Sequence, residues 1–145
     1  MPDPRTTNVQ RYREEQGAAR IHLLTAIAPF TVSQDRFIVI EAGEVARLVS
    51  CSRCTPRTVL GQGQAREVAP ETLVAFQRGL AAAEAAWAHD AVPPNVHDGV
   101  TITAEYADAG IYRRVRMVAP PEGSPHARLL AAWLDAFPEV RRALR

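Results

Sequence analysis

The strongest constraint on the fold is the alternation of apolar and polar residues on either side of Ala109 and Gly110, within the segment VTITAEYADAGIYRRVRMV at residues 100–118. Alternation with a period of two is typical of a β-strand that is covered on one face only. A two-residue Ala-Gly turn makes Asp108 face Ile111, and this fixes the pairing of the two strands that it joins.

The register that follows from this turn separates the two faces of the hairpin. Counting back from the turn gives two apolar pairs on one face and two polar pairs on the other: Ala104 with Val115, Ile102 with Met117, Glu105 with Arg114, and Thr103 with Arg116. A slip of one residue would put Val115 and Met117 on the polar face, so we expect this register to be the stable one. The segment therefore predicts a hairpin with one buried face and one solvated face.

An earlier segment, RFIVIEAGEVARLVS at residues 36–50, predicts a second hairpin around Ala42 and Gly43. Both of its faces are mostly apolar, which favours a place near the middle of a sheet that is covered on both sides. The expected faces are Phe37, Val39, Ala46 and Leu48 on one side, and Ile38, Ile40, Val45 and Val49 on the other. Residues 57–60 and 65–68 are expected to continue as a third strand.

Apolar residues at helical spacing predict two amphipathic helices. The first begins at Pro70 and buries Leu73, Phe76, Leu80, Ala83 and Trp87. The second has Ser124 as its N-cap and Pro125 at its first position, and buries Leu129, Leu130, Trp133, Leu134 and Phe137. Pro138 ends or kinks this helix. Residues 138–145 are expected to add a short amphipathic turn whose Val140 and Leu144 side chains point toward the core.

The N-terminal region is less sharply defined by its sequence. Residues 1–7 contain two prolines and no apolar pattern, so we expect a disordered lead-in. A helix is expected over residues 8–28, capped by Asn8. The part RIHLLTAI, residues 20–27, also reads as a strand.

Together these elements predict a single α+β domain over residues 8–145. Its expected architecture is an antiparallel sheet of two β-hairpins, with four to five strands, and helices packed on one face, in the order α-ββ(β)-α-ββ-α. Each hairpin has an acid-Ala-Gly turn and precedes a Pro-Glu helix start, which suggests a duplicated hairpin-helix unit. The first copy contains an extra stretch, residues 51–66, and additions to a scaffold often carry function.

The composition excludes several chemistries. All 17 basic side chains of the 145-residue chain are arginine, so a Schiff-base lysine, a phosphate-loop lysine and a lysine general base are all excluded. No apolar run approaches the roughly 20 residues of a membrane-spanning helix. The polar N-terminus has no apolar signal core, so we expect a cytoplasmic protein.

Cys51 and Cys54 are the only cysteines, and their CxxC spacing fits half of a zinc site or a dithiol redox pair. Zinc is therefore the one cofactor that the sequence suggests, although no His-x3–5-His spacing supplies the other ligands. A redox pair normally sits at the start of a helix, whereas the residues after Cys54 read as a strand. Two cysteines in a hairpin loop remain the default interpretation.

The arginines suggest a binding surface. Arg114 and Arg116 lie beside Tyr112 on the solvated face of the second hairpin, and Arg53 and Arg57 belong to the insertion. Such a surface suits an acidic protein partner, because the planar guanidinium pairs with carboxylates. Single-stranded nucleic acid is the alternative partner, but the surface has one aromatic residue, and the net charge is only +1.

In layout, the two hairpin-then-helix units at residues 36–137 resemble small bacterial binding proteins such as the emfourin-type metalloprotease inhibitors. The element order also resembles that of type III secretion chaperones. Both resemblances imply a protein that binds another protein and catalyses nothing. The sequence therefore predicts a non-enzymatic protein-binding module of an inhibitor, immunity or chaperone kind, with a zinc- or thiol-dependent protein and a nucleic-acid-binding module as alternatives.

Overall fold

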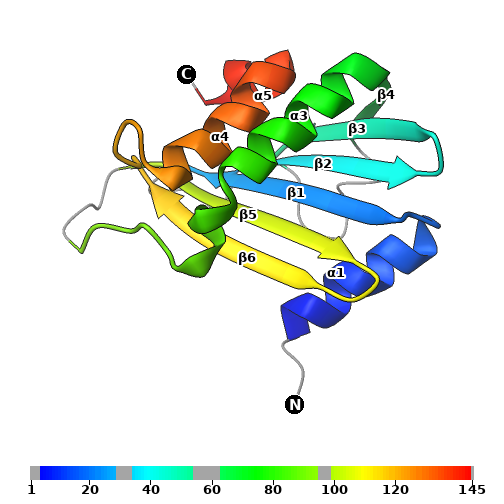
Figure 1. The fold of residues 1–145 in the computed structure, drawn as a ribbon, viewed down its shortest axis with the longest axis horizontal. Helices are drawn as coiled ribbons and strands as arrows, with labels where there is room; N and C mark the ends of the chain where they lie inside the picture. The colour runs from blue at the N-terminus through cyan, green and yellow to red at the C-terminus, as the bar shows by residue number, and fades with distance from the viewer. Residues whose placement is uncertain (1–3, 29–33, 54–62, 95–98, 145) are drawn as a thin grey trace.

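The computed structural model describes residues 4–28, 34–53, 63–94 and 99–144. It has an α+β fold in which helices pack against one antiparallel sheet (Figure 1). In chain order the elements are α1 (Pro4–Glu15), β1 (Arg20–Ile27), β2 (Gln34–Ala42), β3 (Val45–Ser52), β4 (Gln64–Val68), α3 (Pro70–Ala82), the 3-10 helix η1 (Glu84–Ala88), β5 (Thr101–Asp108), β6 (Tyr112–Val118), α4 (Pro125–Ala136) and α5 (Pro138–Ala143).

Within the described ranges the sheet has six strands, in the order β4-β3-β2-β1-β5-β6. Every neighbouring pair is antiparallel. The hairpin β2–β3 lies on one side of β1 and the hairpin β5–β6 lies on the other, so β1 joins the two predicted hairpins into one sheet.

The helix expected over residues 8–28 is wrong beyond Glu15, and the alternative interpretation of residues 20–27 as a strand is confirmed. Helix α1 ends at Glu15, Gly17 takes a positive φ of 61°, and the chain then enters strand β1. Gly17 tolerates this conformation because it has no Cβ atom. Helix α1 also begins at Pro4, so the second half of the expected lead-in is helical, and Asn8 lies inside the helix rather than at its cap.

The main core lies between one face of the sheet and helices α3, α4 and α5, which Figure 1 shows stacked on the same side. Three aromatic rings form its centre: Phe76 lies 5.0 Å from both Trp133 and Phe137, measured between ring centroids. Both expected helix stripes contribute to this core, and the side chain of Ser124 accepts a hydrogen bond from the backbone N–H of Ala127 as an N-cap.

The opposite face of the sheet carries a second, smaller apolar cluster. Its buried members are Ala18, Ile21, Ile38, Ile40, Val49 and Cys51, and Tyr12 of α1 packs against them. The expectation that the helices cover one face only is therefore incomplete, because α1 covers part of the other face. The Tyr12 hydroxyl is buried here without a hydrogen-bond partner among the described residues, and burial raises the pKa of Tyr12 to about 12.

The second hairpin has the expected register, and the first has the expected separation of its two faces. In the first, Val39 faces Leu48, and the two predicted faces are separated as expected, although Val45 is 50% exposed. In the second, Glu105 faces Arg114 and Thr103 faces Arg116. Residues 65–68 form most of β4, whereas residues 57–60 lie outside the described part of the chain.

Helices α3 and α4 approach each other closely at Gly79. A Cβ atom added to Gly79 would lie 2.8 Å from the Cβ atom of Ala132. Such a distance is shorter than real Cβ contacts, so the helices have to separate if both positions carry a side chain.

We expect Gly79→Ala to lower the free energy of unfolding by about 1 kcal/mol, because overpacking outweighs the gain in helix propensity. Moving the methyl group across the interface, in the double variant Gly79→Ala/Ala132→Gly, should relieve the contact. Urea unfolding of the two single variants and the double variant measures the coupling. A double variant that loses as much stability as the sum of the single variants would contradict close packing at this point.

Candidate functional site

The predicted binding residues of the second hairpin lie on the sheet face opposite α3 and α4. Tyr112, Arg114 and Arg116 alternate along β6 with Val115 and Met117, which are buried in the main core. Arg116 is exposed, and Tyr112 and Arg114 are half-buried. The sequence therefore predicted correctly which side chains of this hairpin lie on the face opposite the main core.

The tyrosine on this face is held in place by an acid on the neighbouring strand. The Tyr112 hydroxyl donates a 2.6 Å hydrogen bond to Oε1 of Glu105. Burial is the main cause that raises the pKa of Tyr112, and the bond to Glu105 adds to it. Glu105 therefore pairs with the tyrosine rather than with Arg114, the residue that it faces in the register.

The two arginines on this face differ from the described arginines that form ion pairs. Neither Arg114 nor Arg116 forms an ion pair with a carboxylate of the described residues, whereas five other arginines do: Arg13, Arg20, Arg66, Arg113 and Arg141. The positive charge of Arg114 and Arg116 is thus not neutralised by a direct contact within the described chain.

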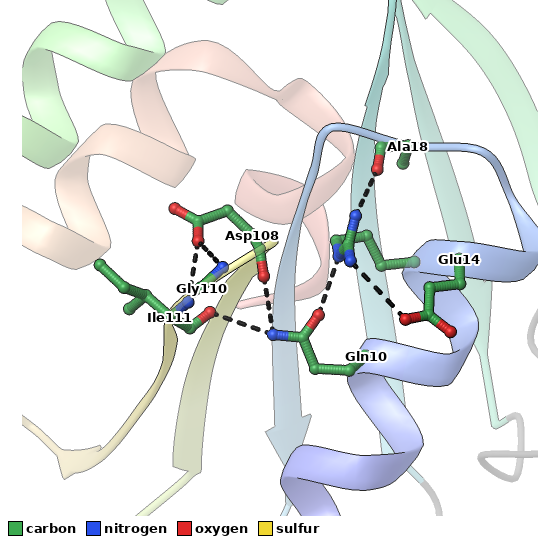
Figure 2. A network of polar contacts seen from close by, with 7 residues as sticks. Gln10, Glu14, Ala18, Asp108, Gly110 and Ile111 are labelled. Atoms are coloured by element: carbon green, nitrogen blue, oxygen red, sulfur yellow. Dashed lines mark hydrogen bonds and ion pairs between the residues drawn. The ribbon is translucent and has the colours of Figure 1, made fainter.

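Helix α1 fixes the tip of this hairpin (Figure 2). Gln10 Nε2 donates hydrogen bonds to the carbonyl oxygens of Asp108, at 2.7 Å, and Ile111, at 3.3 Å. Asp108 Oδ1 in turn accepts from the backbone N–H groups of Gly110 and Ile111. These backbone bonds are the main reason that the pKa of Asp108 lies below its usual value, so its side chain stays ionised and keeps the turn closed.

A small hollow lies beside the hairpin on the helix side of the sheet. It has a volume of about 200 Å³, and its walls come from α3, η1, β5 and the start of β6. Its lining includes Leu80, Trp87 and Ile111, and the ion pair between Arg113 and Glu84 also borders it. Ile111 is 43% exposed and borders this hollow.

The arginines of the insertion do not join this site. Arg53 is exposed and takes a positive φ of 60° directly after β3, and Arg57 lies outside the described residues. Strands β2, β1 and β5 separate β3 from β6. At a spacing of about 4.8 Å between neighbouring strands, β3 and β6 are about 19 Å apart.

The predicted thiol pair is only partly within the described chain. Cys51 is disulfide-bonded and buried at the end of β3, and Cys54 lies outside the described residues. Among the described residues no group of three or more histidine, cysteine, aspartate or glutamate side chains could hold a metal ion. His126 and His89 approach within 5.7 Å between ring centroids, but His126 Nε2 contacts the carbonyl oxygen of His89 at 2.7 Å.

A buried polar pair that the sequence did not reveal joins β1 and β2. His22 Nε2 lies 2.6 Å from Oε2 of Glu41, and Gln77 of α3 donates to Oε1 of Glu41 at 2.8 Å. Both His22 and Glu41 are less than 9% exposed. The His22 ring also packs on Phe76 and Tyr106.

Glu41 keeps its charge in this buried position. Burial alone would raise the pKa of Glu41, but the hydrogen bond and charge of His22, together with Arg20 and Gln77, lower it below its ordinary value. Because the ionised carboxylate only accepts hydrogen bonds, His22 Nε2 carries the proton that it donates. Both carboxylate oxygens of Glu41 are engaged within the protein, one by His22 and one by Gln77. These contacts hold β1, β2 and α3 together.

Comparison with known proteins gives no relative. No protein-family model matches the chain, and neither a curated protein nor a solved structure matches it. Over the described ranges, no helix is long and apolar enough to cross a membrane.

Proposed function

We infer that this chain is a non-enzymatic protein-binding module of an inhibitor, immunity or chaperone kind, and that it contacts its partner through the Tyr112–Arg116 face of β6. The observation that carries this proposal is the pair of arginines, Arg114 and Arg116, that find no carboxylate partner among the described residues. Arginine and tyrosine are also enriched at protein interfaces and among the residues that carry most of the binding energy.

The chemistry of this face favours an acidic partner protein. A guanidinium group forms two parallel hydrogen bonds with a carboxylate, which gives both energy and orientation. The hairpin that presents these groups is already ordered by Gln10 and Asp108, so little conformational freedom is lost on binding.

The same face is less suited to single-stranded nucleic acid. Such binding needs aromatic rings on which successive bases stack, whereas Tyr112 is half-buried and bonded to Glu105. The carboxylate of Glu105 would also repel a phosphate group. The net charge of +1 adds no general attraction for a polyanion.

Charge reversal on this face tests the proposal. We expect Arg114→Glu and Arg116→Glu each to weaken the complex with a partner purified from the native source by about tenfold or more, with an unchanged melting temperature, because both side chains project away from the core. Isothermal titration with the purified partner measures the affinity. The control is Arg128→Glu, an exposed arginine on α4, which should bind as the unmodified chain does.

Two results would contradict the proposed function. The first is equal binding by all three variants. The second is tight, salt-sensitive binding of a single-stranded RNA that Arg114→Glu abolishes, measured by fluorescence anisotropy at two salt concentrations, which would favour the nucleic-acid alternative.

A further inference from the structure

Strand β6 lies at one edge of the sheet, so only one of its sides is paired with another strand. Residues of a strand direct their backbone N–H and C=O groups alternately to the two sides. The backbone N–H and C=O groups of Arg116 point away from β5. Its N–H donates to Asp90 Oδ1 at 2.9 Å, and its carbonyl oxygen accepts from Ala91 N–H at 2.9 Å.

The same alternation places the backbone groups of Tyr112 and Arg114 on the outer side of β6. Residues 112–118 pair with β5 in a continuous register, so no bulge interrupts the alternation. Beyond Arg116 the outer side is occupied by Ala91, which also accepts a hydrogen bond from Val118 N–H. No described residue supplies such a partner to the backbone of Tyr112 or Arg114.

An unpaired strand edge is a template for another strand. Here two N–H groups and two C=O groups, those of Tyr112 and Arg114, are available for pairing. An added strand would stop at Ala91, which closes the far end, and at the tip held by Gln10. The open stretch therefore suits a short extended segment.

The two faces of β6 would meet different side chains of an added strand. Successive residues of that strand would point to opposite faces of the sheet, as those of β6 do. On one face they would lie beside Tyr112 and Arg114, with Arg116 at the closed end of the open stretch, and the positive charge favours acidic side chains. On the other face they would lie beside Arg113 and Ile111, where the hollow of about 200 Å³ has room for an apolar side chain.

We propose that the outer edge of β6 at Tyr112–Arg114 binds an extended segment of a partner protein that alternates acidic and apolar residues, by adding it as a strand to the sheet. The proposal rests on the proposed function and specifies how that partner is bound. Backbone hydrogen bonds would supply affinity, and the arginines and the hollow would supply specificity.

A second copy of this chain is a poorer occupant of the same edge. Pairing of β6 with β6 of another copy would bring Arg114 and Arg116 of one chain close to those of the other. Like charges at cross-strand positions are destabilising. An acidic segment meets no such repulsion.

Amide hydrogen exchange, followed by NMR on the unmodified chain, tests the added strand directly. The probe is an end-capped peptide with the sequence Glu-Leu-Glu-Val-Glu. We expect saturating peptide to slow the exchange of the Tyr112 and Arg114 amides at least tenfold, and to leave the amides of Arg113 and Val115, which already face β5, unchanged. A peptide with lysine in place of glutamate is the control and should protect neither.

Unchanged exchange at Tyr112 and Arg114 with bound or saturating acidic peptide would overturn strand addition. Protection that appears without peptide, as the protein concentration is raised, would also overturn it, in favour of a second copy as the occupant.

A backbone variant separates strand addition from the proposed function. Arg114→Pro removes an outward N–H, which an edge strand tolerates, whereas Arg114→Thr keeps the N–H and removes only the charge. We expect the proline variant to bind the purified partner at least tenfold more weakly than the threonine variant.

If the two variants bind equally weakly, the arginine surface is used, but strand addition is wrong. If both bind as the unmodified chain does, strand addition and the proposed function both fail. The exchange measurement on the unmodified chain decides the question even if the proline variant does not fold.

Discussion

Trp133→Ala is expected to lower the free energy of unfolding by about 3–5 kcal/mol, the range for truncating a large buried aromatic side chain. Trp133 is 2% exposed and lies at the centre of the core between the sheet and α4. Its ring centroid is 5.0 Å from that of Phe76 and 5.7 Å from that of Phe137. Removing the indole therefore leaves a cavity and breaks two aromatic contacts, each of which stabilises the fold beyond its buried area.

Urea denaturation followed by circular dichroism measures this loss. Because single domains are typically stable by about 5–15 kcal/mol, this loss is a large fraction of the total stability. The matched control is Trp87→Ala, at the chain's only other tryptophan, which is partly buried at the edge of the same core. An equal loss in the two variants would show that Trp133 is not the centre of the core.

The parts of the fold that were predicted correctly are those with a local signal. The Ala-Gly turn and the alternation around it specify the β5–β6 register, and every predicted pair of that hairpin is present. Helices α3 and α4 were predicted from apolar stripes and from Pro70, Ser124 and Pro125 at their starts. In each case residues close in sequence determine the local structure.

The sequence left strand β1 open between helix and strand, because the environment of this strand is not local. As a central strand it contributes Leu24 to the main core and Ile21 to the smaller cluster on the opposite face. Both of its faces are covered, so the polar residues that would mark a period of two are missing. Its apolar residues then fit a helical spacing equally well.

The candidate binding surface was predictable in part, because the register of the second hairpin is set by residues close in sequence. Tyr112, Arg114 and Arg116 were placed on the solvated face by the hairpin register. The open edge at Tyr112–Arg114 was not predictable, because it depends on the strand order and on the pairing of Ala91 with the far end of β6. The His22–Glu41 pair was missed because it exists only once β1 is known to be a strand beside β2.

That pair gives the second large expected effect. We expect Glu41→Ala to lower the free energy of unfolding by about 3 kcal/mol at neutral pH, since removing a buried acceptor leaves its buried donors without a hydrogen-bond partner. The variant would remove the acceptor for both His22 and Gln77. The matched control is Glu44→Ala in the exposed turn between β2 and β3, where we expect a change within about 0.5 kcal/mol.

The pH dependence of the stability lost in Glu41→Ala identifies the electrostatic part of that loss. The pKa of Glu41 lies below its ordinary value of 4.5 in the folded chain. Below that ordinary value the unfolded chain takes up a proton at this position before the folded chain does, so the stabilisation is complete above pH 4.5 and is lost as the pH falls through the folded-state pKa. The difference in stability between the unmodified chain and Glu41→Ala should therefore shrink on acidification from pH 7 to pH 3. A difference that stays constant over this range would show that Glu41 stabilises the sheet by packing alone.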